Sequence, residues 1–164
     1  LSTFHEAKLA DALAAHTISM VVLMLLIPFF GKLTDRVGRK PVLIVVLLGF
    51  VVATYPLFSL LFDHTFARLL WSMLAFAVLQ AMFQAVMPAL MTESFPKQVR
   101  YTGLSVSYNI AMALFGGTTP LVCTWLVKVS GGNVMMPAYY LIATAVIALV
   151  TVRFLPETYK AELK

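Results

Sequence analysis

The sequence predicts an all-α membrane protein with five transmembrane helices. Of its 164 residues, 61% are hydrophobic and only 12% are charged, whereas a typical soluble domain is about 45–50% apolar and about 25% charged. The apolar residues gather in five runs, each close to the roughly 20 residues that a helix needs to cross a bilayer. Strands are disfavoured in this setting, because an open sheet edge leaves backbone groups without partners in lipid.

The five predicted helices are separated by short polar connectors. The first run follows a polar opening and stops at the charged stretch GKLTDRVGRK, and the second lies between that stretch and Asp63. The third lies between Arg68 and Glu93, the fourth between Arg100 and Lys128, and the fifth before a polar tail. Each run lacks a polar face, which is typical of a helix surrounded by lipid or by other helices. The helices are expected at residues 12–30, 41–62, 69–91, 102–127 and 135–155, with loops at 31–40 and 92–101 and a tail at 156–164.

The basic residues predict the orientation of these helices. If segment 31–40 is cytoplasmic, connector 92–101 and the tail lie on the same side, and only Lys8, Arg68 and Lys128 lie outside. The positive-inside rule favours this arrangement, so the C-terminus is predicted to be cytoplasmic. The other nine of the 12 Lys and Arg residues are then cytoplasmic: Lys32, Arg36, Arg39, Lys40, Lys97, Arg100, Arg153, Lys160 and Lys164.

Composition also argues against several functions. The net charge of +5 comes from short segments between apolar runs rather than from one helix face, so no nucleic-acid partner is expected. Cys123 is the single cysteine, which leaves no disulfide framework or thiolate metal site. No metal ligand set, paired carboxylates or activated serine lies in the runs, so we expect no enzyme, metal or cofactor. The start at Leu1, with a polar opening, suggests a piece of a longer protein rather than a signal peptide.

The charged segment 31–40 resembles the G-x-L-x-D-R-x-G-R-K/R signature of the major facilitator superfamily. The resemblance implies a cytoplasmic loop whose contacts hold one side of a transporter closed and release as it switches state. Physically, the glycines allow tight turns, and the arginines can pair with carboxylates on neighbouring helices. A plain basic loop would explain the charges but not the order of Gly, Asp and Gly. The matching residues of this conformational-switch loop are Gly31, Asp35, Arg36, Gly38, Arg39 and Lys40.

Two further motifs and a longer stretch extend the resemblance. Glu93, Phe95, Pro96 and Arg100 resemble an E-x-F-P-x-x-x-R connector, and Pro156-Glu157-Thr158 resembles the P-E-T that follows the last helix. In the family's order, residues 1–164 would form a partial C-terminal six-helix half, with helices eight to twelve present and helix seven and the N-terminal half missing. The fourth run is most similar to proline/betaine transporters of the metabolite:proton symporter branch. Citrate and α-ketoglutarate symporters share its FGG-T-P pattern: Phe115, Gly116, Gly117, Thr119 and Pro120.

Polar residues within the runs are candidates for lining a substrate cavity. Ser105, Tyr108, Asn109 and Thr119 fall on one stripe of the fourth helix at i, i+3, i+4 and i+14. Close packing through small residues is the alternative explanation. In the same helix Gly116, Gly117 and Pro120 predict a hinge, because glycine weakens a helix and proline removes a backbone hydrogen bond.

Three other side chains stand out because polar groups in hydrocarbon need partners. Gln80 and Gln84 lie four residues apart, hence on one face of the third helix. They could line a cavity or form interhelical hydrogen bonds. His16 is an ionisable residue within a run and a candidate for proton linkage, although a solvated histidine near a helix start is the alternative.

Together these resemblances imply a proton-coupled symporter, working by alternating access, in a bacterial inner membrane. No Lys or Arg lies deep in the runs, which favours a small zwitterion such as proline or betaine over the alternative of a carboxylate such as citrate. The expected partners are the substrate, protons, the lipid bilayer and the missing part of the transporter. A non-transporting structural subunit is the alternative of a different class.

Overall fold

The computed structural model describes residues 2–61, 65–93 and 95–154, with side chains from Leu9 onward. These described residues form helices and connectors without any strand. The prediction of an all-α fold is confirmed. In chain order the elements are α1 (Ser2–Val37), α2 (Arg39–Leu61), α3 (Phe66–Glu93), α4 (Arg100–Ala111), the π-helix η1 (Met112–Gly116), α5 (Thr119–Val129) and α6 (Met136–Phe154).

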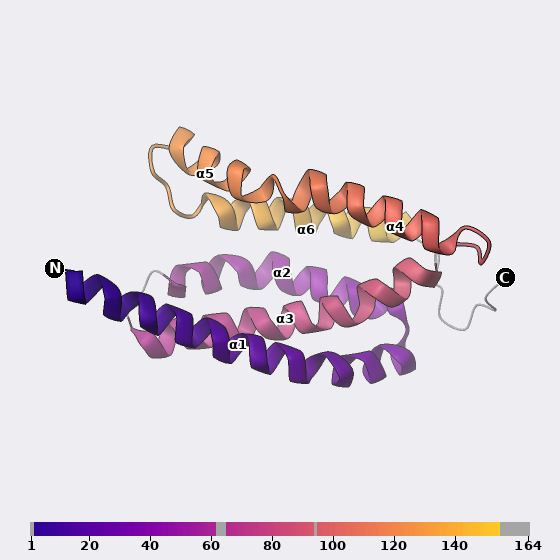
Figure 1. The fold of residues 1–164 in the computed structure, drawn as a ribbon, viewed down its shortest axis with the longest axis horizontal. Coiled ribbons are helices and arrows are strands. Elements are labelled where there is room, and N and C mark those ends of the chain that lie inside the picture. The colour runs from indigo at the N-terminus through magenta and orange to yellow at the C-terminus, as the bar shows by residue number, and fades with distance from the viewer. Residues whose placement is uncertain (1, 62–64, 94, 155–164) are drawn as a thin grey trace.

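The helices run along the long axis of the molecule and alternate in direction (Figure 1). α1, α2 and α3 form one group, in which α3 packs against both α1 and α2. α6 packs on the other side of α2, and the α4–η1–α5 segment runs beside α6 (Figure 1). The connection from α1 to α2 therefore lies at the same end of the bundle as the link from α3 to α4.

α2 is the centre of the packed core. Its buried side chains recur at i, i+1, i+4, i+5 and i+8, so they follow one face of the helix. Helices in lipid associate through close van der Waals contact rather than by exclusion of water. The association of α2 with its neighbours therefore depends on how closely the side chains of this face pack. The core cluster consists of Val42, Leu43, Val46, Leu47 and Phe50 from α2, Val86 and Leu90 from α3, and Ala145 and Val152 from α6.

The outer surface of the bundle is apolar as well. Met24, Leu25 and Phe29 are exposed on α1 by 75%, 70% and 68%, which would be unfavourable in water but suits contact with lipid tails. Within the described residues, five helical stretches are long and apolar enough to cross a membrane: Leu9–Val37, Arg39–Leu61, Phe66–Glu93, Arg100–Val129 and Met136–Phe154.

The predicted loop at 31–40 is wrong. α1 continues through Gly31 to Val37, and α2 starts at Arg39, so Gly38 alone lies outside a helix. Gly31 does not end the helix because its backbone can stay helical and the residues after it, including Lys32 and Arg36, are compatible with a helix. The connector at 92–101 is shorter than expected, because α3 continues to Glu93 and α4 starts at Arg100. The tail at 156–164, with Pro156, Glu157 and Thr158, lies outside the described residues.

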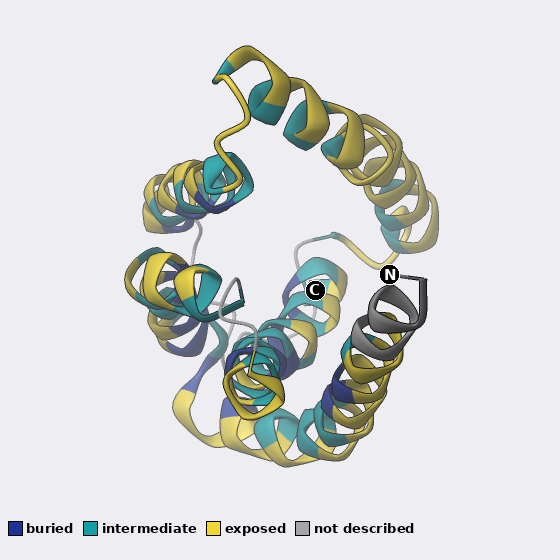
Figure 2. Ribbon diagram, turned by 90° about the vertical axis from the view of Figure 1, so that its left-hand side faces the viewer, coloured by how far each residue is buried: buried dark blue, intermediate teal, exposed yellow. Residues whose placement is uncertain are grey.

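The fourth predicted helix, 102–127, is present but interrupted. It is divided into α4, η1 and α5, with a turn at Gly117 and Thr118. No residue of these three elements is buried, and Figure 2 shows the segment as mostly exposed, with some residues of intermediate burial. The segment therefore contributes little to the core that α2 organises.

The α2–α3 contact offers a test of packing. A Cβ atom at Gly49 would come within 2.6 Å of Leu79 Cδ2, whereas a Cβ at Gly31 would meet no heavy atom within 4 Å. We expect Gly49→Leu to lower the free energy of unfolding by about 1–3 kcal/mol through overpacking. Gly31→Leu is the matched control and should not lower it, because the site is open and leucine favours a helix over glycine by about 0.5–1 kcal/mol. Thermal unfolding of the detergent-solubilised protein measures both, and equal losses would contradict close packing at Gly49.

Candidate functional site

Gly38 allows α1 and α2 to meet at one end of the bundle. Its φ is 108°, a conformation that side chains rarely adopt. Its amide donates a hydrogen bond to the Thr34 carbonyl at 3.0 Å, which closes α1 with a left-handed C-terminal cap. The charged segment is therefore two helix ends held in a fixed relation, and not an extended loop.

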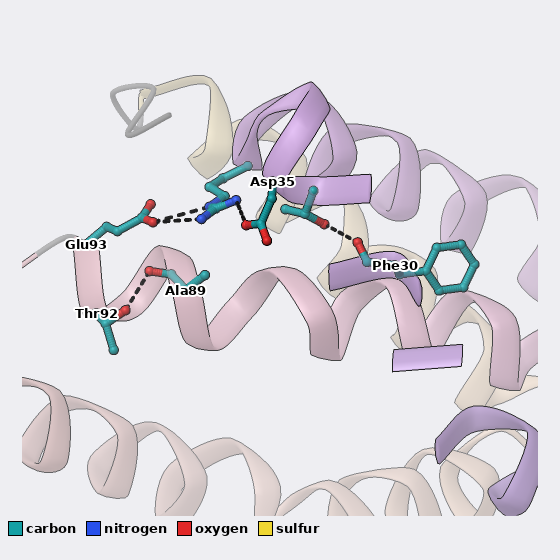
Figure 3. Close-up of polar contacts among 7 residues, drawn as sticks. Phe30, Asp35, Ala89, Thr92 and Glu93 are labelled. Atoms are coloured by element: carbon teal, nitrogen blue, oxygen red, sulfur yellow. Dashed lines mark hydrogen bonds and ion pairs between the residues drawn. The ribbon is translucent and has the colours of Figure 1, made fainter. Parts of the chain in front are cut away.

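Arg39 connects three helices at this end. Its Nη1 donates to Asp35 Oδ1 of α1 at 2.6 Å, and its Nη2 and Nε donate to Glu93 Oε1 of α3 at 3.0 and 3.3 Å. Figure 3 shows the labelled Asp35 and Glu93, with these hydrogen bonds drawn as dashed lines. Asp35 and Glu93 come from two separately predicted motifs, and the structure brings these motifs together.

The two carboxylates do not contribute equally. The side chain of Asp35 is 67% exposed, whereas those of Arg39 and Glu93 are 14% and 20% exposed. An exposed ion pair contributes at most about 1 kcal/mol, while a hydrogen bond to a charged group away from water contributes about 1.5–3 kcal/mol. Asp35, Arg39 and Glu93 form a polar cluster, in which the Arg39–Glu93 bond is the principal connection between α2 and α3.

Residues of the E-x-F-P-x-x-x-R motif also hold the link from α3 to α4 in place. Arg100 Nε donates to the Phe95 carbonyl at 3.1 Å. A Cβ at Gly103 would lie 2.7 Å from Phe95 Cδ1, so the ring packs directly on the α4 backbone and needs glycine there. On α2, Lys40 Nζ donates to the Arg153 carbonyl near the end of α6 at 3.2 Å. This end of the bundle therefore carries polar contacts among α1, α2, α3 and α6, with the α4 start held by Phe95.

A cavity of about 610 Å³ lies among α1, α2, α3 and α6. It is lined mostly by apolar side chains and includes two of the predicted candidates, His16 and Gln80. Gln84, one turn further along α3, is exposed and does not line it. Of the two glutamines, which were predicted either to line a cavity or to form interhelical hydrogen bonds, Gln80 lines this cavity and Gln84 does not.

The polar stripe of the fourth helix lies apart from this cavity. Ser105, Tyr108 and Asn109 are exposed on α4, and Thr119 is half-exposed at the start of α5. Asn109 Nδ2 donates to the Ser105 carbonyl at 2.8 Å, so part of its hydrogen-bonding capacity is used within its own helix. A role of the stripe in a substrate pathway stays a prediction.

The predicted hinge coincides with irregular helix geometry. The Gly117 amide donates to the Met112 carbonyl at 2.9 Å, which is the i to i−5 spacing of a π-turn. The hydroxyls of Thr118 and Thr119 donate to the carbonyls of Leu114 and Phe115 just before the break. The weakening expected from Gly116, Gly117 and Pro120 is thus visible as an interruption, while movement about it stays a prediction.

Sequence reasoning missed most of the cavity wall. Phe76 and Ala77 share the face of α3 that carries Gln80, at the i−4 and i−3 positions, and following that face would have found them. Ser19, three residues after His16 on α1, could have been found in the same way. Within the part of the chain that the structure describes, no cluster of three His, Cys, Asp or Glu residues could hold a metal ion.

Comparison with known proteins gives consistent matches. The family model described as Major Facilitator Superfamily matches residues 3–164. A Staphylococcus aureus (strain COL) protein provisionally named a proline/betaine transporter is 35% identical over 148 residues, which are 88% of this chain and 32% of that protein. The glycine betaine/proline/ectoine/pipecolic acid transporter OusA of Dickeya dadantii is 36% identical over 145 residues, 88% of this chain and 28% of that protein.

A third relative is the ectoine/proline transporter ProP of Corynebacterium glutamicum. It is 33% identical over 154 residues, which are 94% of this chain and 30% of that protein. The chain thus spans about a third of the length of the curated relatives it matches. No solved structure matches it.

The polar cluster makes a prediction about stability. Glu93→Gln should lower the free energy of unfolding by about 1.5–3 kcal/mol, because Arg39 loses a charged partner away from water. Asp35→Asn, the matched control, should cost less than about 1 kcal/mol because that pair is exposed. Chemical or thermal unfolding in detergent compares the two. A larger loss for Asp35→Asn than for Glu93→Gln would contradict this ranking.

Proposed function

Because the chain belongs to the major facilitator superfamily, we propose that it forms part of a secondary active transporter for small zwitterionic solutes such as proline or betaine. The observation that carries the proposal is the bridging of α1, α2 and α3 by Arg39 at one end of the bundle. Breaking and re-forming such contacts is a physical means of switching a transporter between two states. The names of the relatives, which include proline, betaine and ectoine, support the substrate class.

The polar cluster would act as the switch of an alternating-access cycle. In this proposal Gly31, Asp35, Arg36, Gly38, Arg39 and Lys40 control the closed state at one side of the membrane, and the interruption at Gly116, Gly117 and Pro120 lets the fourth helix bend. The rest of the transporter, including helix seven and an N-terminal half, would supply the opposing surface. The coverage of about a third of each relative supports this division.

The chain is a multi-pass integral membrane protein, given its family and its five apolar helical stretches. We propose that it lies in a bacterial inner membrane with its C-terminus in the cytoplasm. Two observations support this: the relatives come from bacteria, and Arg36, Arg39, Lys40, Arg100 and Arg153 gather at one end of the bundle.

Proton coupling belongs to the same proposal. His16 is the candidate for proton linkage, because it is the one ionisable side chain among the residues that line the cavity. The relatives' names, which describe transporters, support a transport role rather than an enzymatic one. The alternative substrate, a carboxylate such as citrate, is favoured only by the FGG-T-P pattern, and the cavity lining includes no Lys or Arg to bind it.

Uptake by cells that express the full-length protein containing this chain tests the function. We expect uptake of labelled proline or glycine betaine that a protonophore abolishes, because proton coupling requires the proton gradient. Labelled citrate and α-ketoglutarate are the comparison substrates. Protonophore-sensitive uptake of the carboxylates instead would overturn the zwitterion assignment, and uptake of none of the four would overturn the proposed function.

The switch is tested by Asp35→Asn in the same cells. An exposed ion pair of at most about 1 kcal/mol shifts a two-state equilibrium by up to about fivefold, so the transport rate should fall by about three- to fivefold. The amount of protein in the membrane, measured by immunoblot, should stay the same. Lys32→Gln, an exposed neighbour on α1, is the control with an unchanged rate. A parallel loss of rate and protein would leave Asp35 with only a folding role.

A further inference from the structure

One buried hydroxyl in the interior of the bundle has no hydrogen-bond partner. The side chain of Thr54 on α2 is 0% exposed, and within the part of the chain that the structure describes its Oγ1 atom makes no hydrogen bond. The atom has almost no accessible surface, so water cannot reach it in this conformation. A buried hydroxyl without a partner is unfavourable. This conformation therefore leaves a hydrogen bond of Thr54 unmade.

A second buried threonine shows where the missing bond would form. Thr34 on α1 is 1% exposed, and its hydroxyl donates to the Phe30 carbonyl, four residues earlier, at 2.8 Å. The corresponding acceptor for Thr54 is the Phe50 carbonyl. Threonine in a helix divides between two rotamers because its hydroxyl can bond to such a carbonyl. Rotation of the Thr54 side chain would thus supply the bond.

The sequence places Thr54 where α2 is easiest to bend. Pro56, two residues later, has no amide proton for the Val52 carbonyl, which weakens the helix at this point. A threonine that bonds to the carbonyl four residues before it also bends a helix. Thr54 is the last buried residue of α2, so residues 55–61 are not fixed in the core. The end of α2 can therefore tilt while the rest of the helix stays packed.

A bend at this point would change the cavity among α1, α2, α3 and α6. The part of α2 before Thr54 and the part beyond Pro56 each contribute two side chains to the cavity wall. A change of angle between these two parts moves one pair of side chains relative to the other. The four residues are Leu47, Phe50, Phe58 and Leu61.

We propose that Thr54 and Pro56 form a bending point of α2 that changes the opening of this cavity, an inference that rests on the proposed transport function. In the described conformation the Thr54 hydroxyl is unbonded. In a second conformation it donates to the Phe50 carbonyl, and residues 55–61 tilt. The unfavourable hydroxyl makes the described conformation less stable and so keeps the second one close to it in free energy. A transporter needs such a balance to populate two states.

Spin-label distances in the full-length protein test the bend without relying on transport. With Cys123→Ala and no other cysteine, labels at the exposed positions Ser59→Cys and Ile147→Cys connect the end of α2 to α6. We expect two populations of distance. Thr54→Val keeps the shape of the side chain but removes the hydroxyl, so it should shift their ratio by about fivefold or more toward the described conformation.

The matched control pair lies on the other side of the bend. Labels at the exposed positions Val45→Cys and Ile147→Cys should give one distance with and without Thr54→Val. Pro56→Ala restores the amide proton for the Val52 carbonyl and should shift the ratio for the 59–147 pair in the same direction as Thr54→Val. A single distance for the 59–147 pair in the protein with Thr54 and Pro56 intact overturns the bending point.

Thermal unfolding in detergent tests the unbonded hydroxyl. Thr54→Val should raise the Tm by about 2 °C, because it removes an unfavourable buried group and loses no hydrogen bond. Thr34→Val is the matched control, since Thr34 is equally buried but its hydroxyl is bonded, and it should not raise the Tm. A lower Tm for Thr54→Val would overturn the inference, because it would mean that the hydroxyl has a partner.

Uptake kinetics separate the bending point from the function. Thr54→Val should lower kcat for labelled proline by about threefold or more at an unchanged amount of protein in the membrane, whereas Thr54→Ser, which keeps the hydroxyl, should stay within about twofold. Normal uptake with an unchanged kcat in Thr54→Val overturns the bending point while the transport function stands. Two distance populations that shift in Thr54→Val, without uptake of any tested solute, support the bending point and overturn the transport function.

Discussion

The constraint on which this structure depends is that a polypeptide in lipid must satisfy its own backbone hydrogen bonds. It explains why five apolar runs become helices with a connector as short as one glycine. It also explains the hydrogen bonding at the irregular stretch between α4 and α5, where proline and a π-turn interrupt the helical backbone hydrogen bonds. There the hydroxyls of Thr118 and Thr119 bind carbonyls of the preceding turn, so the break does not leave all of its polar groups facing hydrocarbon.

The same constraint determines where strong polar interactions occur. Arg39 carries a charge close to the apolar core and is only 14% exposed, yet it has carboxylates from two neighbouring helices within hydrogen-bonding distance. At this end of the bundle the helices are connected by ionic contacts. In the cavity further along, the helices are separated by space lined mostly by aliphatic and aromatic side chains. The two regions thus differ in kind: ionic contacts connect the helices in one, and apolar side chains border open space in the other.

Much of this architecture could be predicted from the sequence, because the number of helices and their approximate positions follow from the length of the apolar runs. The ends of the helices were harder to predict. Gly31 and Gly38 look alike in the sequence, but only Gly38 adopts a positive φ and ends α1, a difference that depends on the packing of α2. Motif order correctly pointed to an arginine that pairs with a carboxylate on another helix. It did not identify Arg39 and Glu93 as the principal pair, because their proximity depends on the α2–α3 crossing. Likewise Gln80 and Gln84 share a helix face, and only the tertiary arrangement separates the one that lines the cavity from the one that does not.

The single-residue connection at Gly38 has a mechanical consequence. Moving one helix past its neighbour by a full turn requires about 5.4 Å of translation, whereas one extended residue spans at most about 3.6 Å. With Val37 ending α1 and Arg39 beginning α2, the two helices cannot slide along each other by a turn without unwinding. Relative motion of α1 and α2 is therefore restricted to changes of the angle between the two helices at Gly38. A small change of angle there becomes a large displacement at the far ends, where His16 of α1 and Phe58 of α2 line the cavity.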